Sequence, residues 1–170
     1  MKKGLILLLV LGMATGCTKQ QEVKENIIYE VVVNEHEDDY YYMIGDADYV
    51  FIGKVEEVIT SDASIPDSEI TITVIDSYKR KLHDHIKVTY HGGYSEEGDL
   101  VLRIGDFIQD IIYPQVGETY IFVGNALQDG SIELYDLIGV NQEDRIDEFI
   151  DYLNHEINVE RERYTSIYEG

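Results

Sequence analysis

Apolar and polar residues alternate along several short segments of the chain, and this pattern limits the fold more than any other feature. Ile70, Ile72 and Val74 alternate with Thr71 and Thr73. Successive side chains of a β-strand point to opposite faces, so such a segment predicts a strand with one buried face. Similar segments, or segments rich in β-branched and aromatic residues, give about six predicted strands, at 49–55, 70–74, 86–90, 100–104, 119–123 and 132–138.

Helical patterns flank this run of strands. Residues 37–47 predict a short helix with acidic residues in its first turn, where they favour the helix dipole. Near the C-terminus an apolar stripe predicts an amphipathic helix, with Asn141 as its N-cap. The stripe consists of Ile146, Phe149, Ile150, Leu153 and Ile157. We therefore predict a mainly β fold, a small barrel or curled sheet of about five to six strands, with a helix before the first strand and the C-terminal helix covering one opening.

The N-terminus has the order of an export signal. Lys2 and Lys3 give a positive start, residues 5–13 form a short apolar run, and Ala14-Thr15-Gly16 supplies small residues before Cys17. The apolar run is well short of the roughly 20 residues that a membrane-spanning helix needs. Ala14-Thr15-Gly16-Cys17 resembles the lipobox of bacterial lipoproteins, which implies that Cys17 is acylated and becomes the first residue of the mature chain. The alternative is a free or buried thiol.

This interpretation divides the chain into three parts. Residues 1–16 are a lipoprotein signal peptide, residues 17–36 hold the lipidated cysteine and a flexible tether, and residues 37–170 form one domain. Residues 18–26 are polar and charged, as expected of a spacer. Cys17 is the only cysteine, so the fold must rely on its apolar core and not on a disulfide. The expected location is the extracytoplasmic side of the cell membrane, with a lipid such as palmitate on Cys17.

The charge of the exported part restricts its partners. All 34 acidic residues follow Gly16, whereas Lys2 and Lys3 leave with the signal, so 11 basic residues remain and the net charge becomes −23. This charge repels phosphates and anionic head groups, which excludes nucleic acid and binding to an anionic membrane surface. The acidic residues have no calcium-loop spacing, so weak binding of divalent cations is the expected behaviour, with no cofactor.

Four segments combine apolar residues and glycines in a pattern shared with a known group of proteins. They are 47–55 (ADYVFIGKV), 71–79 (TITVIDSYK), 86–93 (IKVTYHGG) and 116–123 (VGETYIFV). Together they resemble the small bacterial exported proteins with a TIMP-like (netrin-module-like) OB-fold domain. The resemblance covers roughly residues 38–140 and implies an OB-like barrel. These are fold-determining positions, so the resemblance implies little about chemistry.

Three histidines near the middle of the chain suggest a metal site. If Ile86, Val88 and Tyr90 face the core, His85 and His91 face outwards on the same strand, about 20 Å apart, which is too far to share an ion. His83 and His85 lie two residues apart and remain the candidate metal ligands. The alternative, which we favour, is a solvated polar face without a bound metal.

No motif for a hydrolase nucleophile, a zinc protease or a nucleotide-binding loop occurs, and Cys17 is used for the lipid. We therefore expect no enzymatic activity. The 14 tyrosines, including Tyr40-Tyr41-Tyr42, suit a contact surface, although half-buried positions in sheets and helices explain them as well. The leading hypothesis is a membrane-tethered, non-catalytic domain that binds a protein or a cell-envelope component. The alternatives are a protease inhibitor of TIMP-like type, which an acylated Cys17 argues against, and an envelope hydrolase.

Overall fold

The computed structural model describes residues 27–32, 40–105, 113–139 and 143–170, and five of its strands close into a barrel. The barrel order is β2-β3-β4-β8-β7. The five barrel strands are β2 (Tyr49–Thr60), β3 (Ser68–Lys79), β4 (His85–Tyr90), β7 (Thr119–Ala126) and β8 (Ile132–Gly139). Neighbours pair antiparallel except β4 and β8, which are parallel. The predicted mainly β fold with a small OB-like barrel is confirmed.

The inside of the barrel is filled by the side chains that the alternation placed on one face. Ile70 and Ile72 of β3 meet Ile86 and Val88 of β4, as the strand register pairs them. Phe51 and Phe122 stack with ring centroids 5.2 Å apart. Small barrels of this kind are filled by their own side chains.

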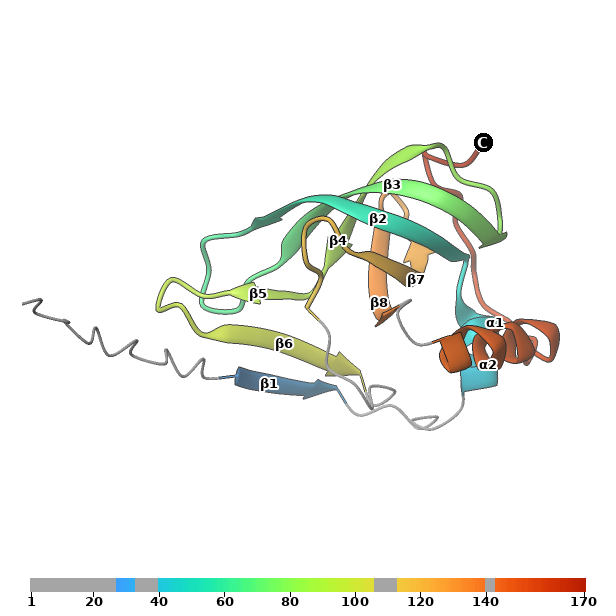
Figure 1. Cartoon of the computed structure of the whole chain (residues 1–170), viewed down its shortest axis with the longest axis horizontal. Helices are drawn as coiled ribbons and strands as arrows, with labels where there is room; N and C mark the ends of the chain where they lie inside the picture. The colour runs from blue at the N-terminus through green and yellow to red at the C-terminus, as the bar shows by residue number, and fades with distance from the viewer. Residues whose placement is uncertain (1–26, 33–39, 106–112, 140–142) are drawn as a thin grey trace, which may run out of the picture.

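A second sheet lies against the barrel and includes two strands that the sequence did not predict, β1 and β5 (Figure 1). β1 (Ile27–Val32) pairs in parallel with β6 (Leu100–Gly105), which pairs antiparallel with β5 (Gly92–Tyr94). The tether predicted over 17–36 is therefore wrong for residues 27–32. The β-branched residues of β1 suit a strand, but its pairing edge lies about 70 residues away in the chain, at β6. The polar stretch 18–26 lies outside the described residues.

Two helices, α1 (Tyr40–Asp46) and α2 (Glu143–Asn154), pack together on the outer face of the barrel (Figure 1). Phe149 of α2 is 1% exposed and belongs to a core cluster that includes Val50 and Ile121, which alternate with the inward-facing residues of β2 and β7. Both predicted helices are present. α2 ends before Ile157, and Asn141 lies outside the described residues.

The C-terminal segment 158–170, and not α2, crosses one end of the barrel. The start of β2, the end of β3 and the start of β4 lie at this end, as shown by the pairing of Val50 with Lys79. Here the hydroxyl of Tyr49 accepts from the backbone N–H of Ser166 over 2.8 Å. Tyr164 and Tyr168 pack against the barrel core. The expectation that α2 covers an opening is therefore wrong, because its apolar stripe is used on the outer face.

Candidate functional site

A buried ionic cluster joins the start of β2 to the C-terminal segment. Asp48 is fully buried, and its two oxygens accept from Arg163 and Arg161, each over 3.0 Å. The same arginines donate to backbone carbonyls at the end of α1, including those of Gly45 and Asp46. Cations favour a helix C-terminus because its last carbonyls lack partners within the helix. The cluster attaches the C-terminal segment to the start of β2 and the end of α1. Its charged groups make their hydrogen bonds within the molecule.

A second polar cluster lies beside it, at the end of the barrel crossed by the C-terminal segment. The Tyr49 hydroxyl donates to Glu169 over 2.5 Å, and the Arg80 guanidinium lies over the Tyr49 ring, 5.6 Å from its centroid. Burial, followed by the hydrogen bond to Glu169, raises the pKa of Tyr49. Arg80 also donates to the carbonyl of Tyr164. These contacts hold the segment in place, and they leave Tyr49 protonated at neutral pH.

His91 forms the third cluster, at the junction between the barrel and the second sheet. Nδ1 lies 2.7 Å from a carboxylate oxygen of Asp67, and Nε2 contacts the carboxylate of Glu133 on β8. The hydrogen bond to Glu133, opposed by burial and supported by Asp67, raises the pKa of His91. Both ring nitrogens therefore face carboxylates. His91 is not placed to act as a general base on the neighbouring buried Ser68, whose hydroxyl donates to the carbonyl of Gly92.

The predicted candidate ligands His83 and His85 do not share a strand. β4 begins at His85, and the backbone N–H of His83 donates to the carbonyl of Tyr168 in the C-terminal segment. His85 pairs instead with Thr73 across the strands, with Nδ1 3.3 Å from the hydroxyl. In the parts of the chain that the structure describes, no group of three or more His, Cys, Asp and Glu side chains could hold a metal ion. His91 keeps 30% of its side chain exposed, and the chain turns after β4 and brings it against Asp67.

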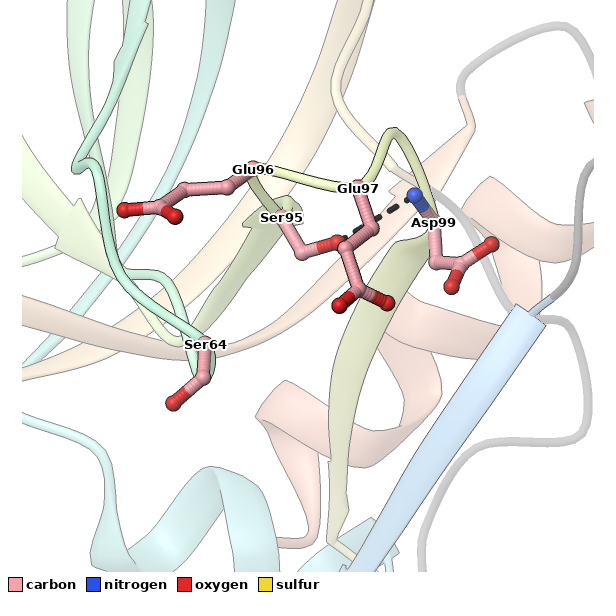
Figure 2. Close-up of a pocket in the computed structure, with 5 residues that line it drawn as sticks. All are labelled: Ser64, Ser95, Glu96, Glu97 and Asp99. Atoms are coloured by element: carbon pink, nitrogen blue, oxygen red, sulfur yellow. Dashed lines mark hydrogen bonds between the residues drawn. The ribbon is translucent and has the colours of Figure 1, made fainter.

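An acidic pocket of about 400 Å³ lies between the β5–β6 loop of the second sheet and the β2–β3 loop of the barrel (Figure 2). It is lined by Ser64, Ser95, Glu96, Glu97 and Asp99. The Ser95 hydroxyl accepts from the backbone N–H of Asp99 over 3.2 Å, which closes a turn. Figure 2 shows the carboxylates of Glu96 and Asp99 pointing in opposite directions. The pocket therefore concentrates negative charge without directing it at one point.

A groove of about 370 Å³ separates the end of β3 from α2 and continues past the end of that helix. It is lined by Tyr78, Lys79, Ile150, Leu153, Asn154 and Glu156. Tyr78 and Ile150 are 37% and 40% exposed, so the walls present apolar surface to solvent. The groove is small for a ligand site, which typically occupies roughly 300–1,000 Å³.

The tyrosine run Tyr40-Tyr41-Tyr42 serves mainly to pack the two helices. Tyr40 stacks on Tyr152 with centroids 5.1 Å apart, and Tyr41 meets the same ring edge-on. Burial, followed by the hydrogen bond to Glu148, raises the pKa of Tyr152 to about 12. The prediction that tyrosines occupy half-buried helix positions is confirmed for Tyr40 and Tyr41.

No family model matches the chain, and no curated protein matches it significantly. The resemblance to TIMP-like modules therefore stays a prediction. Cys17 lies outside the described residues. None of the helices within the described ranges is long and apolar enough to span a membrane.

Proposed function

We propose that the chain is a membrane-tethered lipoprotein whose extracytoplasmic OB-like domain binds a protein or a cell-envelope component without catalysing a reaction. The observation that carries this proposal is the groove between β3 and α2. Tyr78 and Ile150 stay partly exposed there, on a chain with a net charge of −21. Apolar side chains gathered in a groove are typical of a contact surface.

Two further features support the proposal. The barrel interior is filled by its own side chains, so a partner has to be recognised on the outside. The lipobox-like Ala14-Thr15-Gly16-Cys17 is followed by only a short polar stretch before β1 begins at Ile27. A lipid on Cys17 would thus hold the domain close to the membrane, where envelope components are concentrated.

Photocrosslinking in intact cells tests this function. A photoreactive amino acid is placed, one position at a time, at exposed positions over the whole domain of the full chain. Lys54 on β2, Ile150 in the groove and Val116 in a turn are three such positions. We expect one adduct, of constant mass, at a contiguous group of positions. Adducts at no position, or equally at all positions, would contradict the proposal.

A further inference from the structure

One of the residues that line the groove between β3 and α2 is a lysine with several hydrogen-bond partners. Nζ of Lys79 donates to the carbonyl of Ile44 over 2.7 Å and to Glu156 over 2.8 Å. It thereby ties the end of β3 to the last turn of α1 and to the segment after α2. The charge of Lys79 is neutralised by these partners, and its side chain is 19% exposed. The groove is therefore preformed. The only lysine that lines it is already bonded to groups of the same chain.

The apolar walls result from how α2 docks. Phe149 points into the cluster between α2 and the barrel and is 1% exposed, so Ile150, the next residue around the helix, faces away from that cluster. Leu153 lies between Phe149 and Ile150 around the helix axis and is half-buried. Tyr78 stands opposite on β3. An apolar side chain of a partner, inserted between Tyr78 and Ile150, would cover surface that the fold leaves exposed.

Two carboxylates lie near this apolar surface, although neither lines the groove itself. Asp76 lies close enough to Tyr78 to contribute, after burial, to the raised pKa of that tyrosine. Asp147 precedes Ile150 by three residues on α2 and shares its face of the helix, and it is exposed. Lys79 is the only basic residue lining the groove, and Glu156 neutralises it. The groove therefore combines an apolar centre with a negative rim.

From this combination we infer that the groove binds a short basic amphipathic segment of a partner protein. An apolar side chain of that segment occupies the space between Tyr78 and Ile150, and flanking lysines or arginines face Asp76 and Asp147. Charge complementarity of this kind selects partners and speeds association. The inference rests on the proposed binding function and adds the chemistry of the partner and its place of contact.

The test uses the full chain in nanodiscs of zwitterionic phosphatidylcholine, with empty nanodiscs subtracted. The probes are two synthetic amphipathic peptides with the same leucine face, one carrying lysine on the polar face and the other glutamate. Affinity is measured at low and at physiological salt. We expect the lysine peptide to bind about tenfold more tightly than the glutamate peptide, with the difference falling as salt rises.

Two variants locate the contact. Ile150→Asp should weaken binding of the lysine peptide by about tenfold or more, whereas Val116→Asp, which changes an apolar side chain 63% exposed in a turn outside the groove, should leave it within about twofold. Replacing Asp76 and Asp147 with lysine should shift the preference toward the glutamate peptide, which loss of folding would not do. Circular dichroism checks the fold of each variant.

Equal binding of both peptides, no binding, or equal losses in Ile150→Asp and Val116→Asp would overturn the inference. These outcomes are distinct from failure of the proposed function. A constant adduct in cells at positions away from Ile150 would keep the binding function and reject the groove. An adduct at Ile150 to a segment without basic residues would keep the groove as a contact and reject the basic partner.

Discussion

Arg163 donates a hydrogen bond to Asp48 over 3.0 Å, although 115 residues separate the two side chains. Asp48 is fully buried, and its second oxygen accepts from Arg161 and from the backbone N–H of Ala126. A buried carboxylate is tolerated only when its oxygens have partners. The start of the barrel, which holds Asp48, therefore depends on the C-terminal segment, which supplies the arginines.

Removing the buried carboxylate should be strongly destabilising. Asp48→Ala leaves two arginines without their shared partner, and we expect the free energy of unfolding to fall by about 3–5 kcal/mol. Lys54→Ala is the matched control, because it breaks an ion pair with Glu56 whose side chains are 46% and 42% exposed. That change should cost less than about 1 kcal/mol. Urea denaturation measures both, and similar losses would contradict a special role for Asp48.

Gly45 should tolerate no side chain, because another segment passes directly over it. A Cβ at this position would lie 1.7 Å from the carbonyl oxygen of Ile157. We expect Gly45→Ala to cost about 1–3 kcal/mol or more, since backbone has to move. Gly98→Ala is the control: nothing lies within 4 Å of its Cβ, and only its positive φ of 84° is strained. A thermal shift for Gly45→Ala no larger than that of the control would show that the crossing is not tight.

Phe149 should anchor α2 to the barrel. It is 1% exposed and meets Tyr152 edge-on with centroids 6.5 Å apart. Phe149→Ala should lower the free energy of unfolding by about 3–5 kcal/mol, because it opens a cavity at the helix–barrel contact. Ile150→Ala, one residue on and 40% exposed, should cost much less. A loss well under about 1 kcal/mol for Phe149→Ala would mean that α2 is not docked.

What the sequence could predict depended on how far apart the interacting residues lie. Alternation over 70–74 and 86–90 is local, and it predicted strands that the structure contains. β1 was missed because its partner β6 is remote, and Asp67 and Glu133 were missed as partners of His91 because they lie 24 and 42 residues away. One signal was available: Gly45 lies in the last turn of the helix predicted over 37–47, where a glycine lowers helix stability unless the close approach of another segment requires it.

The stability contributed by His91 should depend on pH in a defined direction. Glu133 and Asp67 raise its pKa in the folded state above the ordinary value of about 6.5, so the protonated form is favoured by folding. This contribution is fully present below about pH 6.5 and is lost as the pH rises through the raised folded pKa. His91→Gln should remove it, and the difference in unfolding free energy between wild type and variant should shrink with rising pH.

The control for this experiment is His155→Gln, which changes a histidine on the surface whose side chain is 67% exposed. It leaves His91 and its two carboxylate partners in place, so its profile should differ from that of His91→Gln, which separates the effect of His91 from the titration of the many carboxylates. NMR titration of the imidazole gives the folded pKa directly. A difference between wild type and His91→Gln that is constant from pH 5 to 9, or that grows with pH, would contradict the assigned contacts.

Attachment to the membrane should depend on Cys17. In the proposed signal peptide, Lys2 and Lys3 would orient the segment, and the apolar run 5–13 would be long enough for export but too short to remain as a span. The acidic charge of the rest of the chain would oppose its binding to an anionic surface. One acyl chain holds a protein only marginally, whereas two or three hold it firmly, at about 0.8 kcal/mol per buried methylene.

We expect Cys17→Ser to abolish lipid-dependent processing and membrane retention while leaving the fold intact, with Thr18→Ala as a control that behaves like wild type. Fractionation and intact mass measurement test this: full membrane retention of Cys17→Ser, with no lipid mass on wild-type Cys17, would show that the anchor lies elsewhere.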